Sequence, residues 1–152
     1  MTPEERLKEK GLELPPPRQP VANYVGCVRT GNLVFVSGHG PEVGSGSPWK
    51  GKVGRELSLD EGYAAAKRCA LNMLATLKVE IGELSRVRRI VKLLGMVNSD
   101  PEFKEQPKVI NGASDLLVDI FGENGKHARS AVGLGALPFA IPVEIEMIVE
   151  VE

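Results

Sequence analysis

The feature that most constrains the fold is the alternation of apolar and acidic residues near the C-terminal end of the chain. From Val143 to Val151 the odd-numbered residues are apolar and the even-numbered ones are glutamates, with only Ile148 breaking the pattern. A period of two indicates a β-strand with one buried face. We therefore expect a strand here whose odd-numbered side chains point into a core.

A second short strand is predicted just upstream, from Arg129 to Leu134. The link between the two strands, residues 135–142, is short and carries two prolines, which would interrupt a ladder of hydrogen bonds. Strands joined this closely are commonly antiparallel neighbours. We therefore expect these two strands to pair with each other.

Composition narrows the class of protein. A chain of 152 residues with a net charge of −1 fits one domain and has no basic field to attract nucleic acid, which is therefore disfavoured as a principal partner. Cys27 and Cys69 show no metal-ligand spacing, which argues against a zinc site and a disulfide framework, and Cys27 reads as a small buried hydrophobe rather than a nucleophile. The charged N-terminus and the lack of a long apolar run predict a cytoplasmic protein without membrane contact.

The N-terminal arm, residues 1–21, is predicted to carry one short helix. Thr2 offers an N-cap and Pro3 a favourable first position, and the helix should end before the three prolines at 15–17. The arm could pack on the surface, take part in assembly or remain solvated. Residues 22–152 are expected to form a single domain.

Two long helices are predicted from their caps. Ser58-Leu-Asp-Glu61 is a capping box, after which apolar residues recur every three or four positions until Gly82. Residues 98–101 supply caps and a proline start for the second helix, which Pro107 restarts or kinks and which ends at Gly122. These helices should cover one face of a sheet.

Three further strands complete the expected sheet. Residues 24–29 and 32–37 flank Thr30-Gly31 and should form a hairpin. Residues 86–97 are nearly continuously apolar after a basic start, as expected for a central strand covered on both faces. The order of elements predicts an α+β fold, with a mostly antiparallel sheet and two long helices packed on one face.

The segment 38–54 contains six glycines and two prolines and is predicted to be a long, mobile loop of the kind that borders sites. Residues 46–52 match the spacing of a phosphate-binding loop, but Val53 stands where a magnesium-binding Ser or Thr would be, so a nucleotide site is disfavoured. Trp49 could be a lid over a ligand, an anchor at a subunit contact, or simple packing of the loop.

Several short motifs occur together in the C-terminal half. They are Ala128-Arg129-Ser130, Gly133, Leu137-Pro138 and Val143-Glu144-Ile145-Glu146, and they are accompanied by Tyr24, the run NLVFVSG at 32–38 and the helix that begins near Ser58. This arrangement resembles the RidA/YjgF family of reactive-intermediate deaminases, also called endoribonuclease L-PSP. The resemblance covers roughly residues 22–152. His127 stands where the family usually has proline or alanine.

The resemblance implies both an assembly and an activity. Family members form chorismate-mutase-like homotrimers with three clefts between subunits, which would bury the second face of the sheet. The implied reaction is the hydrolytic deamination of reactive 2-imino or enamine acids to 2-keto acids and ammonia, without a metal or other cofactor. The implied partner is a small carboxylate-bearing imine, enamine or keto acid.

The resemblance also assigns residues. Arg129 matches the arginine that clamps the substrate carboxylate, a task for which the guanidinium fork is suited; without the resemblance, a salt bridge to a glutamate would be the simpler interpretation. Glu144 matches the glutamate that positions the attacking water. Substrate-binding positions are Tyr24, Ser37, Gly38, Ser130 and Ala131. Further candidates are His39, where the family often has glutamine, Ser114, where it often has asparagine, and His127.

Two other functions stay open at this point. The chain could bind a small carboxylate metabolite in the same cleft without turning it over. It could also be an endoribonuclease, as the older family name says, but this would need a basic groove lined by aromatic residues. The only basic cluster, in residues 86–92, has no aromatic residue near it and is better explained as a solvated edge or a subunit contact.

Overall fold

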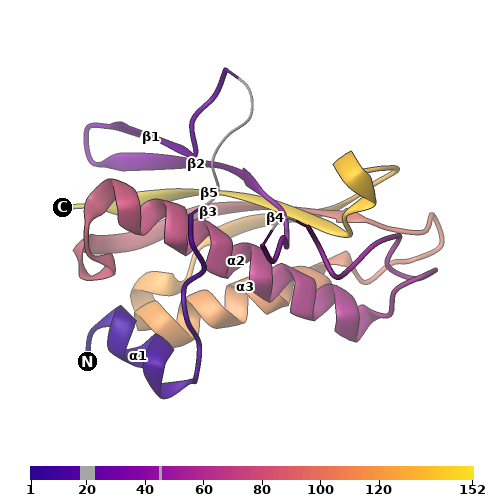
Figure 1. Cartoon of the computed structure of the whole chain (residues 1–152), viewed down its shortest axis with the longest axis horizontal. Helices are drawn as coiled ribbons and strands as arrows, with labels where there is room; N and C mark the ends of the chain where they lie inside the picture. Colours follow the sequence, from indigo (N-terminus) through magenta and orange to yellow (C-terminus); the bar gives the residue numbers. More distant parts are fainter. Residues whose placement is uncertain (18–22, 45) are drawn as a thin grey trace.

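A computed structural model describes residues 1–17, 23–44 and 46–152 of the chain. Its helices are α1 (Pro3–Glu9), α2 (Leu59–Ile81) and α3 (Gln106–Phe121), with short 3₁₀ turns η1 (Leu84–Arg86), η2 (Gly122–Gly125) and η3 (Pro138–Ala140). Its strands are β1 (Cys27–Thr30), β2 (Leu33–His39), β3 (Val87–Asn98), β4 (Ala128–Leu134) and β5 (Val143–Val151). The sheet has the order β1-β2-β5-β3-β4, and α2 and α3 lie along one of its faces (Figure 1). The predicted α+β fold is confirmed.

The alternating strand, β5, is the centre of the sheet. Its odd-numbered residues, from Val143 to Val151, are all buried under α2 and α3. It pairs antiparallel with β2 on one side and with β3 on the other. The sequence pattern therefore predicted this strand and its buried face correctly.

The prediction that β4 and β5 pair with each other is wrong. Strand β3 lies between them, and β4 pairs with β3 in parallel. Eight extended residues can span about 26 Å, and two strand spacings take only about 10 Å. The link 135–142 is therefore long enough to cross the end of β3, and its shortness did not require the two strands to be neighbours.

Helix α2 begins and ends at its predicted caps. The backbone nitrogen of Glu61 donates to Ser58 Oγ, and that of Ser58 donates to Glu61 Oε1, both over 3.1 Å. The helix ends at Gly82, whose φ of 88° suits a glycine. The hairpin of β1 and β2 also forms around Gly31, with Thr30 opposite Leu33.

Helix α3 begins later than predicted. Its first residue is Gln106, and Pro107 lies in its first turn. Asp100 caps a short turn instead, because its Oδ1 accepts from the backbone nitrogen of Glu102 (2.9 Å) and its backbone oxygen accepts from that of Phe103 (2.9 Å). An aspartate followed by proline favours either a turn or a helix start, and here it forms the turn.

The described part of the N-terminal arm packs against the domain. Glu4 Oε1 accepts from the backbone nitrogen of Leu84 at 2.6 Å, and Arg6 Nη1 donates to the backbone oxygen of Ile120 at 3.2 Å. Leu7 is buried in the main core. Helix α1 thus lies beside the end of α3 (Figure 1). The predicted boundary at residues 21 and 22 lies outside the described residues.

The sheet face opposite the helices is not fully covered within one chain. Val28, Phe35 and Val132 point to this open face and are 53%, 43% and 41% exposed. Strand β3 was predicted to be covered on both faces, but Leu94 and Met96 on its open side are only half-buried. No helix in the described part of the chain is long and apolar enough to cross a membrane.

Candidate functional site

A β-bulge at Ser37 and Gly38 shapes the first group of predicted site residues. Val36 is opposite Met147 and His39 is opposite Ile145, so three steps along β2 match two along β5. Bulges of this kind re-aim side chains and are frequent next to active sites. Ser37 Oγ donates to the backbone oxygen of Val25 (2.6 Å), which ties the segment after Tyr24 to the bulge.

Glu144 lies directly against this bulge. A Cβ atom added to Gly38 would be 2.6 Å from Glu144 Oε2 and 3.2 Å from its Cδ. Only glycine leaves room there for the carboxylate in its present position. We call Tyr24, Ser37, Gly38 and Glu144 the acidic half-site.

His39 is turned away from the open face by the same bulge. Its side chain is only 2% exposed, and it lies on the helix side of the sheet. Its Nδ1 is 2.5 Å from the backbone oxygen of Ser37, and its Nε2 is 2.8 Å from Thr76 Oγ1 on α2. Because a carbonyl oxygen can only accept, Nδ1 carries a proton and donates it to Ser37. His39 therefore supports the bulge from below.

Arg129 belongs to a second group, at the corner between α3 and the edge strand β4. Its Nη1 donates to Asn111 Oδ1 (2.8 Å) and to Ser114 Oγ (3.1 Å), both on α3. Within the described parts of the chain, its Nε and Nη2 make no hydrogen bond. One edge of the guanidinium is thus held by the protein and the other is available for a ligand.

Ser114 and His127 complete this group. Ser114 Oγ is 2.9 Å from His127 Nε2, and His127 Nδ1 is 2.7 Å from the backbone oxygen of Gly125. Burial and the nearby Arg129 charge lower the pKa of His127, although its bond to Gly125 acts in the opposite direction. The imidazole is therefore neutral at pH 7. We call Asn111, Ser114, His127 and Arg129 the arginine half-site.

The remaining candidates on β4 divide between the two faces of the sheet. Ala131 is on the helix side with Arg129 and packs against the core. Ser130 is exposed and registers with Leu94, on the open side. Asn111 was not singled out from the sequence. The available signal was its place on α3 three residues before Ser114, on the same side of the helix.

The two half-sites are separated within one chain. Arg129 registers with Leu93, whereas Glu144 registers with Met96. Two strand spacings across the sheet and three residues along it place their Cα atoms about 14 Å apart. Their side chains also point to opposite faces. One chain therefore does not bring Arg129 and Glu144 to the same small ligand.

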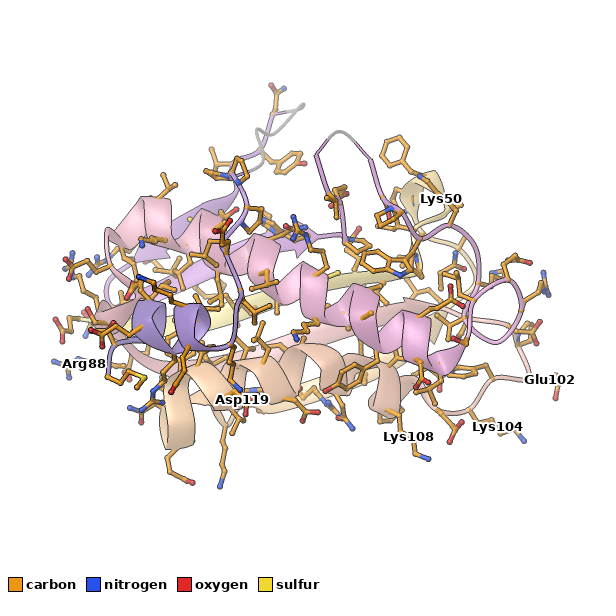
Figure 2. All side chains as sticks on the ribbon, turned by 60° about the horizontal axis from the view of Figure 1, so that its bottom comes forward. Lys50, Arg88, Glu102, Lys104, Lys108 and Asp119 are labelled. Carbon is orange, nitrogen blue, oxygen red and sulfur yellow. The ribbon has the colours of Figure 1, made fainter. Side chains whose placement is uncertain are left out.

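A pocket of about 610 Å³ shares Tyr24 with the acidic half-site, but Ser37, Gly38 and Glu144 do not line it. Tyr24 and His39 line it together with the prolines at 15–17, Asn72, Ile141 and Phe139. Phe139 and Ala140 have positive φ values of 59° and 56°, which is unusual for residues other than glycine. Lys50 secures this turn by donating from Nζ to the backbone oxygen of Phe139 at 3.0 Å (Figure 2).

Other residues singled out from the sequence have structural environments. Trp49 packs partly against the core, which supports simple packing over a lid. Lys52, the lysine of the loop with phosphate-binding spacing, donates to Asn98 Oδ1 (2.8 Å) and to the backbone oxygen of Gly135. Burial, followed by the charge of Glu80, raises the pKa of the Cys27 thiol, so this cysteine is not an activated nucleophile.

Comparison with known proteins gives closely similar relatives. A family model described as "YjgF/chorismate_mutase-like, putative endoribonuclease" matches residues 4–149. The chain is 45% identical to Protein TCP17 of Trypanosoma cruzi over 95% of this chain and 91% of that protein.

Two solved structures cover 99% of this chain. The protein Atu1372 from Agrobacterium tumefaciens, described as having unknown function, is 47% identical, with a TM-score of 0.93 and 92% of its chain covered. A "putative endoribonuclease" from Shewanella oneidensis MR-1 is 36% identical, with a TM-score of 0.96 and 100% of its chain covered.

Proposed function

Because this chain belongs to the YjgF/chorismate mutase-like family, we propose that it hydrolyses reactive 2-imino or enamine acids to 2-keto acids and ammonia, in clefts between copies of the chain in the cytoplasm. The observation that carries the proposal is that Nε and Nη2 of Arg129 make no hydrogen bond with the residues that the structure describes. A guanidinium edge without a protein partner is suited to holding a carboxylate through two parallel hydrogen bonds.

The proposed reaction needs only positioning and proton transfer from the protein. Arg129 binds the substrate carboxylate, and the backbone of Ala131 contacts the imine nitrogen. Glu144 orients a water molecule toward the carbon of the C=N bond, takes up one of its protons as the C–O bond forms and passes this proton to the nitrogen, which becomes the amino group of the adduct. Glu144 then transfers the hydroxyl proton of the adduct to the amino group. The tetrahedral adduct then releases ammonia as the C–N bond breaks, and the carbonyl of the 2-keto acid forms.

The separation of the half-sites supports a cleft between subunits. A homotrimer would cover the open sheet face, where Val28, Phe35 and Val132 are exposed. It would also allow Arg129 of one copy to face Glu144 of the next copy. We therefore propose a trimer with three clefts, each taking one half-site from each of two copies. Light scattering after size exclusion should show a trimer; a stable monomer at micromolar concentration would argue against this arrangement.

Mixed trimers test the intersubunit cleft directly. Arg129→Ala and Glu144→Gln should each be nearly inactive in imine hydrolysis, measured as the competition between the protein and semicarbazide for a freshly formed imino acid. When the two variants are co-refolded in equal amounts, about a quarter of the clefts should combine an intact Arg129 with an intact Glu144. Activity should therefore recover to about a quarter of the parental value. A mixture as inactive as its two components would reject the shared cleft.

The same experiments separate the alternatives. A non-catalytic binder would bind 2-keto acids through Arg129 but leave imine hydrolysis at its background rate. Endoribonuclease activity, which the descriptions of the family and of the Shewanella protein mention, is less well supported. Arg86 and Arg89 of the basic cluster donate to the backbone oxygens of Ile81 and Lys126. Arg88 points into solvent at the opposite end of the molecule from Lys50, which borders the pocket (Figure 2).

A further inference from the structure

The hydrogen bonds of the arginine half-site can be arranged in only one direction. The backbone oxygen of Gly125 only accepts, so His127 Nδ1 carries the proton that it receives. Neutral His127 then has an acceptor at Nε2, which takes the hydroxyl proton of Ser114. Arg129 has donors only, so Ser114 Oγ must accept from its Nη1. The donor and the acceptor of each of these hydrogen bonds are therefore determined.

The first member of this series of hydrogen bonds, Gly125, is fixed by packing. Gly125 is buried, and a Cβ atom added to it would be 2.2 Å from the backbone oxygen of Leu117 on α3. The backbone of Gly125 is therefore packed against the helix that also carries Asn111 and Ser114. The Ser114 hydroxyl then points toward the acceptor that lies 2.9 Å from it, His127 Nε2.

The last hydrogen bond of this series, from Arg129 to Ser114, determines which edge of the guanidinium can contact a ligand. Nη1 has two hydrogens, and both are directed at α3, one to Asn111 Oδ1 and one to Ser114 Oγ. A carboxylate that needs two parallel donors is left with Nε and Nη2. The usual alternative, the edge formed by Nη1 and Nη2, is not available while these bonds persist.

We propose that His127 is a positioning residue for Arg129: through Ser114 it holds Nη1 inside the protein, so that the substrate carboxylate binds to the Nε and Nη2 edge. This inference rests on the proposed function of Arg129. A serine bonded to a histidine could also act as a nucleophile. Here Ser114 Oγ also accepts from a cation, which makes it a weaker nucleophile, so orientation is the better explanation of the pair.

Calorimetric titration of the full-length protein with pyruvate, a small 2-keto acid, tests the inference. His127→Phe removes the acceptor, and affinity should fall about tenfold, the effect of losing one hydrogen bond to a charged network. His127→Gln keeps an acceptor near the position of Nε2 and should bind within about threefold of the parent. Ser114→Ala should lose as much affinity as His127→Phe and also serves if the phenylalanine variant does not fold.

A double variant separates orientation from general structural damage. In Ser114→Asn, the amide oxygen can accept from Arg129 without help from His127. Adding His127→Phe to this background should therefore cost less than about twofold in affinity. An equal loss of affinity in both backgrounds would overturn the positioning of Arg129 by His127 through Ser114, and would leave His127 with a packing role. Parental affinity in both His127→Phe and Ser114→Ala would overturn it as well.

Nuclear magnetic resonance tests the proposed edge. The Nε–H signal of Arg129, assigned by its absence in Arg129→Lys, should shift when pyruvate is added. An unchanged Nε–H signal at saturating pyruvate would overturn the binding mode. Arg129→Ala distinguishes the two levels of the argument. If Arg129→Ala binds pyruvate as the parent does, the proposed function fails. If Arg129→Ala loses affinity but the His127 and Ser114 variants bind as the parent does, only the positioning role of His127 fails.

Discussion

Gly38→Ala should separate turnover from binding. The added Cβ would be 2.6 Å from Glu144 Oε2, 3.2 Å from its Cδ and 3.4 Å from its Cγ. An ordinary carbon–oxygen contact is about 3.3 Å or longer, so the carboxylate must move by about 0.7 Å. The obstacle is the end of a flexible side chain rather than backbone, so the protein should remain folded, with a stability loss below about 1.5 kcal/mol.

The catalytic effect should be much larger than the effect on stability. Displacing a catalytic group by about 1 Å can cost about a hundredfold in rate, so we expect imine hydrolysis to fall about 10- to 100-fold, or about 1.4 to 2.7 kcal/mol in activation free energy. Pyruvate affinity should stay within about threefold, because Arg129 is contributed by the other half-site.

The assay compares semicarbazide competition, calorimetric binding and thermal melting for the parent, Gly38→Ala and Gly135→Ala. Gly135 is a matched control, since a Cβ there meets nothing within 4 Å and its φ is not positive. Parental turnover in Gly38→Ala would refute the role of the Glu144 carboxylate. A loss of pyruvate affinity equal to the loss of turnover would instead show that Gly38 itself contacts the ligand.

Three further outcomes are expected. Arg129→Lys should lose most pyruvate affinity and Arg129→Ala nearly all, about 30-fold to several thousandfold, in the same calorimetric assay, because a point charge cannot replace a bidentate fork. Gly112→Ala should lower stability to urea by about 3 kcal/mol or more, since a Cβ there would be 2.0 Å from the backbone oxygen of Tyr63 and the helices would have to separate. The pKa of His127 is lower in the folded chain than in the unfolded chain, so the unfolded chain binds more protons between the two values and stability falls as pH decreases below about 6.5. His127→Gln should flatten this slope in urea titrations from about pH 6.5 to 5, and an unchanged slope would contradict it.

The parts of the fold that local chemistry determines were predictable. The capping box at Ser58 and Glu61 needs only residues three apart, and the alternation in β5 needs only the pleat of one strand. The order of strands was not predictable in this way, because the link 135–142 can either turn back or step over β3. Asp100 is equally suited to a turn and to a helix start, and the tertiary contacts decided between them.

The candidate site shows the same limit. The motifs that identified Arg129 and Glu144 lie close together in sequence, but strand β3 separates the two residues, and the register places their side chains on opposite faces of the sheet. The orientation of His39 depends on one extra residue in the bulge, and no sequence pattern predicts this bulge. Asn111 has no motif of its own, and only the position of Arg129 against α3 gives it a role. The proposed role of each residue could thus be predicted from the sequence, whereas the positions of these residues relative to one another could not.

The central place of β5 also has a consequence for the order in which the molecule can be built. Of the five strands, β5 leaves the ribosome last, yet it joins β2 to β3. Until it arrives, the β1–β2 hairpin and the β3–β4 pair have no backbone partners between them, and α2 and α3 have no complete sheet to cover. Contacts this distant in sequence form slowly, and unpaired strand edges attract other chains. A nascent chain halted before Val143 would therefore hold two separate half-sheets, each of them a substrate for chaperones rather than a smaller version of the fold.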